Sequence, residues 1–161
     1  MQAIHDAGVR SVNGLDLERL GRFLRRLSPA TVRARYLGGP PMQDIVLERE
    51  VSRMLSTDRS DHTVLVAVAN DEIRGVAEYI ADTPGRAEIA IVVEDEFHGR
   101  GIGKSLFQNL ACRAQVHGIQ MFTGDVATTN HRMLTLLRRG GHKVRLQSSY
   151  TPSASLTSAA C

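Results

Sequence analysis

The sequence predicts a single domain of the α+β class, and three observations support this. Apolar residues at helical spacing dominate the chain up to Leu55, three strand-like runs follow closely between residues 62 and 93, and strand and helix patterns alternate over residues 119–150. At 161 residues, with 42% hydrophobic and 23% charged residues, the chain is large enough for one sizeable core. We therefore expect one domain over residues 1–150 and a small polar tail over residues 151–161.

The N-terminal part is predicted to be helical after one short strand. Asp16 precedes apolar residues at helical spacing and is a candidate N-cap, and Ser28 followed by Pro29 suits the start of a second helix. The glycines and prolines of residues 38–41 interrupt that second helix. The expected elements are a strand over Val9–Asn13, helices that begin after Asp16 and at Pro29, and a third helix over Ile45–Leu55.

The middle of the chain predicts an antiparallel meander of three strands. Turn residues at positions 70–71 and 82–85 separate β-rich runs that are close enough in sequence to pair as neighbours. The strands are expected over His62–Ala69, Ile73–Ala81 and Ala87–Val93. The rest of the chain is expected to form a helix over Ile102–His117, a strand over Ile119–Ala127, a helix over Asn130–Arg139 and a strand over His142–Tyr150.

A glycine-rich turn between the third strand of the meander and the next helix predicts a phosphate-binding site. Gly99, Gly101 and Gly103 alternate there, and a backbone without Cβ atoms lets N–H groups approach an anion. The following helix directs its positive end at the same place, and Arg100 and Lys104 add positive charge. The turn is compatible with a diphosphate, as in coenzyme A, or with a nucleoside triphosphate.

The triphosphate alternative corresponds to a P-loop phosphotransferase. Gly103, Lys104 and Ser105 match the end of the P-loop motif, but its first glycine should stand at position 98, where this chain has His98. The acidic residues at positions 94–96 would also lie beside the triphosphate, which is electrostatically unfavourable. Both observations favour the diphosphate.

The turn resembles the cofactor-binding motif of the GNAT superfamily of N-acetyltransferases. Residues 98–103 read His-Gly-Arg-Gly-Ile-Gly, where the family has Gln or Arg, two variable residues, Gly, one variable residue and Gly or Ala. Residues 130–141 resemble the family's closing helix, and phrases at residues 27–38 and 87–90 resemble, more narrowly, bacterial protein lysine acetyltransferase domains. The resemblance implies the GNAT fold, a mixed and mostly antiparallel sheet of about six to seven strands flanked by helices.

The same resemblance implies direct transfer of an acetyl group from acetyl-CoA to a primary amine, either of a small molecule or of a protein lysine. Backbone groups of the strand that ends at Val93 would bind the pantetheine arm as a neighbouring strand would. The glycine turn would hold the diphosphate. The expected cofactor-binding residues are Ile91, Val92, Val93, His98, Gly99, Arg100, Gly101, Ile102, Gly103, Lys104 and Asn130, the last of which also suits a helix cap.

Three positions depart from the family pattern. His98 replaces the usual Gln or Arg, and its side chain carries full charge only near or below a pKa of ~6.5. His142 replaces the usual Phe after the last helix. Leu137 stands where many members carry a tyrosine thought to protonate the departing thiolate, so the sequence assigns no general acid.

Glu88 is the expected general base. An amine with a pKa of ~10.4 is protonated at neutral pH and must lose a proton before it attacks. Glu88 lies in an otherwise apolar strand and shares a face with the small Ala90, and the lysine acetyltransferase resemblance implies a catalytic glutamate at this position. Glu78 is the substitute base if the cleft lies elsewhere, although a solvent-facing strand residue is its simpler interpretation.

Besides an acetyltransferase, the sequence leaves one other class of protein open. A non-catalytic acyl-CoA-binding sensor or interaction domain is the main alternative, motivated by Leu137 and His98.

A net charge of +3 with dispersed basic residues predicts no nucleic-acid partner, and no apolar run is long enough for a membrane span. The six histidines lack ligand spacing, so we expect no metal. Without a signal-peptide pattern the expected location is the cytoplasm, and a homodimer is a further expectation from the resemblance.

Overall fold

The computed structural model describes residues 7–36, 43–56, 61–127, 129–139, 143–146 and 152–155, the last two ranges by their backbone alone. The expectations for residues 37–42, 57–60, 140–142 and 147–150, including His142, lie outside the described residues. The elements are β1 (Gly8–Ser11), η1 (Gly14–Asp16), α1 (Leu17–Arg26), α2 (Pro29–Tyr36), α3 (Asp44–Leu55), β2 (His62–Ala69), β3 (Glu72–Thr83), β4 (Arg86–Val93), η2 (Asp95–Phe97), α4 (Ile102–Val116), β5 (Met121–Thr123), α5 (His131–Arg139), β6 (Lys143–Leu146) and β7 (Pro152–Ser155).

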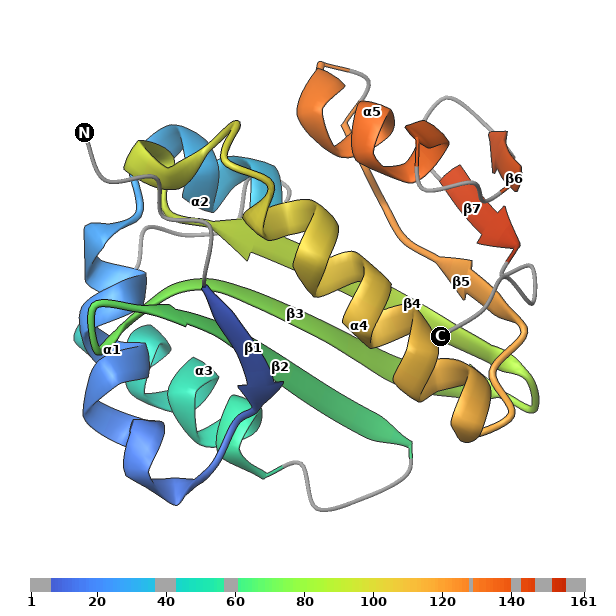
Figure 1. Ribbon diagram of the computed structural model, residues 1–161. Helices are drawn as coiled ribbons and strands as arrows, with labels where there is room; N and C mark the ends of the chain where they lie inside the picture. Colours follow the sequence, from blue (N-terminus) through green and yellow to red (C-terminus); the bar gives the residue numbers. More distant parts are fainter. Residues whose placement is uncertain are drawn as a thin grey trace.

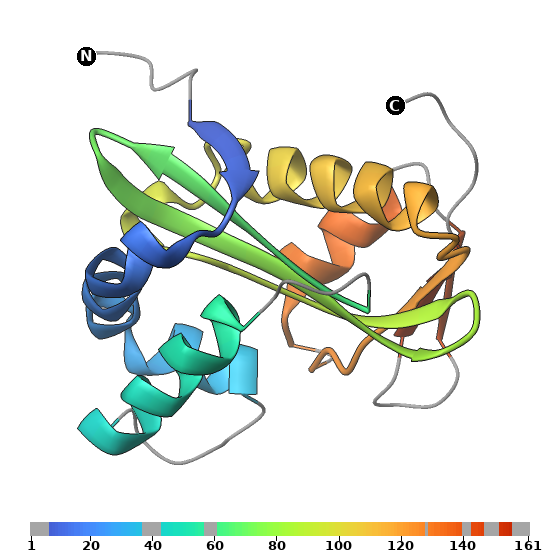
Figure 2. The same cartoon turned by 90° about the horizontal axis from the view of Figure 1, so that it is seen from below.

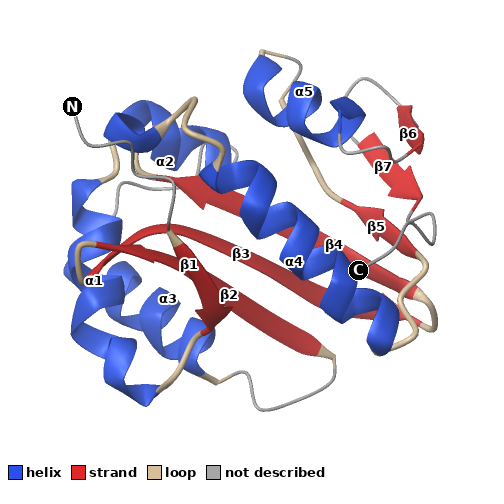
Figure 3. Cartoon of the chain, in the orientation of Figure 1, coloured by secondary structure: helices blue, strands red, loops and turns tan. Residues whose placement is uncertain are grey.

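These elements form a three-layer arrangement around one sheet (Figures 1 and 2). Helices α1, α2 and α3 lie on one face, and α4 and α5 lie on the other. The sheet has seven strands in the order β1-β2-β3-β4-β5-β7-β6, and β4 and β5 are its one parallel pair among the described strands. The predicted α+β class and the mixed, mostly antiparallel sheet are therefore confirmed (Figure 3).

The meander of β2, β3 and β4 forms as the sequence predicts. Antiparallel pairing runs from His62↔Ile80 to Ala69↔Glu72 and from Gly75↔Val93 to Thr83↔Arg86. Asn70 and Asp71 have φ values of 52° and 61°, which the tight two-residue turn between β2 and β3 requires. Both residue types tolerate this left-handed backbone because their short polar side chains bond locally.

Strands β4 and β5 pair only briefly. Their parallel register covers Arg86↔Met121, Ala87↔Phe122 and Glu88↔Thr123, and beyond these pairs the two strands separate (Figure 1). The sequence predicted a strand over Ile119–Ala127, which is longer than β5, because an apolar pattern does not show where a strand loses its partner. The edge of β4 beyond Glu88 is therefore not paired with β5.

The C-terminal end of the sheet differs from the prediction. Residues 152–155 belong to the stretch expected as a small polar tail, yet they form β7, which pairs antiparallel with both β5 and β6. Backbone pairing on both sides stabilises β7, and it does not depend on the apolar side chains that the sequence prediction looked for. The sheet thus extends past residue 150.

Two starting positions of helices illustrate how capping works in this chain. The Ser28 hydroxyl accepts a hydrogen bond from the Thr31 backbone N–H at 3.2 Å, as predicted for the start of α2. Asp16 does precede α1, but its buried carboxylate does not cap that helix. Instead it accepts from the Asn13 N–H at 3.0 Å and from Arg10 at 2.7 Å, which closes a capping box around η1.

The two faces of the sheet carry separate buried clusters. One packs α1, α2 and α3 against residues of β2, β3 and β4 such as Val66, Val76 and Val92. The other packs α4 and α5 against the opposite faces of these strands, with Phe107, Leu110 and Phe122 at its centre. The packing of α4 against this face of the sheet sets where the N-terminal turn of the helix lies.

Gly75 permits the close approach of α4 to β3. A Cβ atom at Gly75 would lie 2.8 Å from Leu106 Cδ1, 3.1 Å from Ile102 Cγ2 and 3.3 Å from the Val92 carbonyl oxygen. The first contact is shorter than real Cβ contacts, and both side chains belong to the first turns of α4. The helix can therefore lie this close only over a glycine.

Replacing Gly75 with alanine is expected to destabilise the protein by about 1–3 kcal/mol, because the added methyl group forces α4 away from the sheet. Gly8→Ala is the matched control, since Gly8 is also in a strand and nothing lies within 4 Å of its Cβ position; its effect should stay within about 0.5 kcal/mol. Urea unfolding of both variants measures the difference. Equal stabilities would contradict the packing argument.

Candidate functional site

The glycine turn forms an exposed backbone cradle at the start of α4. Gly99 and Gly101 have φ values of 74° and 83°, in the left-handed region that favours glycine, and nothing lies within 4 Å of either Cβ position. Gly101 is the N-cap of α4, and its carbonyl accepts from the Ser105 N–H at 3.0 Å. The first N–H groups of the 15-residue helix point out of this turn without intrahelical partners. Such a cradle fits a phosphate or diphosphate.

Positive side chains surround the cradle. Arg100 and Lys104 are exposed, and the Arg100 guanidinium lies over the Phe97 ring, 4.9 Å from its centroid. Arg74 also lies over this ring at 4.6 Å. The buried Phe97 thus holds one cation of the turn in place by cation–π contact.

The acidic residues before the turn are largely neutralised by other elements. The buried Glu94 carboxylate pairs at 3.0 Å with both Arg26 of α1 and Arg74 of β3. Asp95 accepts hydrogen bonds from Ser28, which directly precedes α2, and from Thr31 of α2. Burial raises the pKa of Asp95, but these hydrogen bonds outweigh it and lower the pKa to about 2. The charges of Glu94 and Asp95 are therefore paired away from the turn.

His98 uses both nitrogens of its ring within the protein. Nε2 lies 2.8 Å from the Val93 carbonyl oxygen, and Nδ1 is hydrogen-bonded to Nη1 of Arg132 on α5. The ring is half-buried. Its backbone is part of the turn as the sequence predicted, whereas its side chain connects the end of β4 to α5.

The separation of β4 from β5 exposes one backbone edge of the segment predicted to bind the pantetheine arm. Ile91 and Val93 pack toward α4 and α5, and Val92 packs toward α1–α3, so their side chains belong to the two buried clusters. A small cavity lies where the strands part. It is lined by Ile89, Phe122, Thr123, Gly124, Val126, Met133 and Leu137.

Leu137 is buried at this cavity. An aliphatic side chain cannot donate a proton, so this position provides no general acid. Asn130 caps α5, because its Oδ1 accepts from the Met133 N–H at 3.2 Å. Gly103 of α4 lies close to both β4 and α5. A Cβ atom there would lie 3.8 Å from Val93 Cγ2 and 3.7 Å from Leu136 Cδ2.

Glu88 lies at the closed end of the strand separation. It is the last residue of β4 that pairs with β5, opposite Thr123, and its side chain is exposed. The register Glu78↔Ala90 and the alternation along β4 place Glu88, Ala90 and Glu78 on the α1–α3 face of the sheet. Figure 2 shows that these helices lie away from the β3–β4 turn, and Glu88 is the third residue of β4 after that turn.

Glu78 does not face solvent, which corrects the simpler interpretation of the sequence. It is 3% exposed and accepts a bidentate pair of 2.7 Å bonds from Arg53, a further bond from Arg35 and a 3.0 Å bond from His62. Burial raises its pKa, but the hydrogen bonds from His62 and Arg53 and the charges of both arginines lower it to about 2. A carboxylate held this way is a poor base at neutral pH, so Glu78 is unsuited as the substitute for Glu88.

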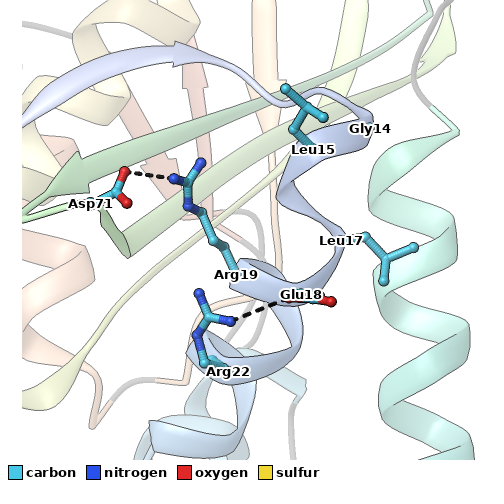
Figure 4. A pocket seen from close by; sticks show the side chains of 7 residues that line it. All are labelled: Gly14, Leu15, Leu17, Glu18, Arg19, Arg22 and Asp71. Carbon is cyan, nitrogen blue, oxygen red and sulfur yellow. Dashed lines mark hydrogen bonds and ion pairs between the residues drawn. The ribbon is translucent and has the colours of Figure 1, made fainter.

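A larger hollow lies elsewhere, beside η1 and α1 (Figure 4). It is lined by Gly14, Leu15, Leu17, Glu18, Arg19, Arg22 and Asp71. Its charged side chains pair with one another, Arg19 with Asp71 at 2.6 Å and Arg22 with Glu18 at 3.8 Å. These residues belong to none of the elements that form the glycine turn or the strand separation.

Comparison with known proteins identifies the family. The model of the acetyltransferase (GNAT) family matches residues 33–141, and this chain therefore belongs to the GNAT family. The match covers the glycine turn, Glu88 and the strand separation. Acetyltransferases of this family use acetyl-CoA, and the assignment removes the P-loop alternative.

Individual relatives agree with this assignment. An acetyltransferase of Pseudomonas aeruginosa is 30% identical over 125 residues, which cover 74% of this chain and 66% of that protein, slightly under two thirds of its length. The GNAT domain of S. lividans PAT matches with a TM-score of 0.82 at 24% identity, over 92% of this chain and 89% of that one. The PaiA N-acetyltransferase of Thermoplasma acidophilum in complex with coenzyme A matches with a TM-score of 0.67 at 20% identity, over 92% and 98%.

Sequence reasoning missed the groups that support the site. The partners of Glu78 come from α2, α3 and β2, and Arg132 meets His98 across 34 positions of sequence. The local spacing of residues in the sequence does not predict contacts between such distant positions. The available signal was the position of Glu78 in a strand rich in apolar residues, because a carboxylate there must be paired or exposed.

Replacing Glu78 with glutamine is expected to lower the free energy of unfolding by about 3–5 kcal/mol at pH 7, because two arginines lose a buried partner. The depressed pKa means that this stabilisation is present above the unfolded-state pKa of 4.5 and is lost as the pH falls toward 2. The stability gap between wild type and Glu78→Gln should therefore narrow over that range in urea titrations.

The matched control is Glu88→Gln, on the same face of the sheet. Because Glu88 is exposed, this substitution should change stability by less than about 0.5 kcal/mol. Similar losses for both variants would contradict the assignment of Glu78 as the buried partner.

Proposed function

We propose that this protein is an N-acetyltransferase that transfers an acetyl group from acetyl-CoA to a primary amine, with Glu88 as general base. The observation that carries the proposal is the geometry of β4. Its C-terminal end leads to the phosphate cradle, and the separation from β5 closes again at Glu88. One strand therefore joins a cofactor site to a candidate base.

The residues around the cradle fit the diphosphate of coenzyme A. The open Cβ positions of Gly99 and Gly101 leave room for an anion against the backbone, and Arg100 and Lys104 supply charge. The edge of Ile91–Val93 is not paired with β5, so its backbone N–H and C=O groups, apart from the Val93 carbonyl that His98 binds, would be available to an arm that contains amides, as a strand offers such groups to a neighbour. When bound, acetyl-CoA supplies a thioester carbonyl that an amine can attack.

The spacing along β4 brings the acyl end toward Glu88. A strand rises about 3.3 Å per residue, so Glu88 lies roughly 16 Å from Val93 along the strand. An arm that starts at the turn and follows β4 through the strand separation is directed toward the cavity beside Ile89, Thr123 and Gly124. Glu88 is the carboxylate of β4 beside this closed end.

Glu88 would accept the proton that the ammonium group must lose. Its exposure on the α1–α3 face lets an amine approach from the side opposite α4, directly or through one water molecule. The neighbouring Ala90 leaves space for the amine. Glu78 would remain ionised and bound to its arginines throughout the reaction.

We further propose protein lysines as an acceptor class, beside small primary amines. The support is the resemblance of residues 27–38 and 87–90 to bacterial protein lysine acetyltransferase domains, together with the similarity to the S. lividans PAT domain. The exposed setting of Glu88, away from the α1–α3 helices, leaves it accessible to a lysine on a protein surface.

A non-catalytic acyl-CoA-binding domain is the second candidate, and the burial of Leu137 at the cavity favours it. Such a domain would bind acetyl-CoA and yield no acetylated product. A panel of amines, lysine peptides and proteins, assayed by mass spectrometry, separates the two. One efficiently acetylated acceptor rules out the sensor.

For the best acceptor in that panel, Glu88→Gln should reduce kcat by about 10²–10⁴-fold, because the amine loses its base. Binding of acetyl-CoA, measured by calorimetry, should be unchanged. Glu48→Gln, which removes another exposed carboxylate on α3, serves as the control and should retain wild-type turnover. Wild-type kcat in Glu88→Gln would exclude Glu88 as the base.

A further inference from the structure

The contact between His98 and Arg132 joins the glycine turn to α5, and it fixes the state of the histidine ring. A guanidinium only donates hydrogen bonds, so Nδ1 of His98 must accept from Arg132 and carries no proton. Nε2 then carries the proton and donates it to the Val93 carbonyl oxygen at 2.8 Å. The ring is thus a neutral tautomer whose two nitrogens are both occupied, and it contributes neither charge nor a free donor to the cradle.

Arg132 brings a cation to the same place from α5. It is exposed, and among the residues that the structure describes the His98 bond is its one polar contact. A guanidinium has five N–H donors, so the others remain available. The nearby Glu94 and Asp95 are bound to α1, β3 and α2, and the first turn of α5 contains no acidic residue.

We propose that Arg132 binds a phosphate group of coenzyme A and that His98 is the residue that positions it. The inference rests on the proposed function, since it requires that the cradle takes this cofactor. His98 directly precedes Gly99, so the bond to its ring places the guanidinium beside the cradle. Arginine suits this role because its planar fork matches phosphate oxygens.

Two elements would contribute different groups to the phosphate site. The turn and α4 present backbone N–H groups and the cations of Arg100 and Lys104, while α5 presents Arg132 from the other side of the separated strands. The neutral ring of His98 connects the turn to α5 and leaves the positive charge of Arg132 unpaired by any carboxylate among the described residues. A charged ring would instead place two cations and two donors against each other.

The test measures coenzyme A binding by calorimetry, without an acceptor, for Arg132→Gln, His98→Ala and the double variant. Arg132→Gln should weaken binding about tenfold, and His98→Ala should weaken it to a similar or smaller extent. The double variant should be no weaker than Arg132→Gln, because the two residues act as one unit. Arg138→Gln removes another exposed arginine of α5 and should bind as wild type does.

Dephospho-coenzyme A, which lacks the 3′-phosphate, identifies the group that is bound. If Arg132→Gln weakens both ligands equally, Arg132 binds the diphosphate; if it weakens coenzyme A alone, Arg132 binds the 3′-phosphate. The thermal unfolding temperature without ligand should match wild type in all variants. A general structural defect would instead lower that temperature.

Four results would overturn all or part of the proposal. Wild-type binding by Arg132→Gln, or an equal loss in Arg138→Gln, removes Arg132 as a ligand. Unchanged binding by His98→Ala beside weakened Arg132→Gln removes His98 as the positioning residue. Absence of binding by the wild-type protein would refute the proposed function itself, and this inference with it.

Discussion

The pairing of β4 with β5 stops after three residues, and the candidate site depends on this constraint. Continuous pairing would fill the backbone edge of Ile91–Val93 and bury it in the sheet. Instead, the meander holds β4 from one side along its whole length, while β5 leaves it after Glu88. The strand stays rigid although one edge is open, which is the condition for recognising an extended ligand by backbone hydrogen bonds. The approach of α4 over Gly75 then places a helix N-terminus at the end of that edge.

Charge around the turn is arranged by elements distant in the sequence. Three consecutive carboxylates precede the glycines, a composition that would repel a diphosphate if all three faced it. Glu94 and Asp95 are instead bound by residues of α1, α2 and β3, and these pairs also attach the N-terminal helices to the strand that carries the site. The same interactions therefore stabilise the fold and keep the charges of Glu94 and Asp95 away from the cradle. Phe97 adds a third link, since it lies under both Arg74 and Arg100.

The sequence was sufficient for features that depend on local patterns. The meander, α4 and the left-handed glycines of the turn follow from alternation, helical spacing and the absence of Cβ atoms, and the structure confirms them. The end of β5 could not be predicted, because where a strand loses its partner is decided by the packing of the whole sheet. The strand over residues 152–155 was missed because small polar side chains carry no apolar pattern. The burial of Glu78 was missed because its partners lie 16 to 43 positions away.

Glu78 and Glu88 show how one face of one sheet can give two carboxylates opposite properties. They belong to adjacent strands and point the same way, yet α2 and α3 cover only the first. Coverage supplies two arginines, which together with His62 lower the pKa of Glu78 to about 2, so that this carboxylate is a weak base near neutral pH. Glu88 lies beyond the helices, close to the turn that ends β3, and remains accessible. The limit of helical coverage on this face, rather than the identity of the residue, therefore sets the different environments of the two glutamates, and it is the physical basis on which we propose Glu88 and not Glu78 as the base.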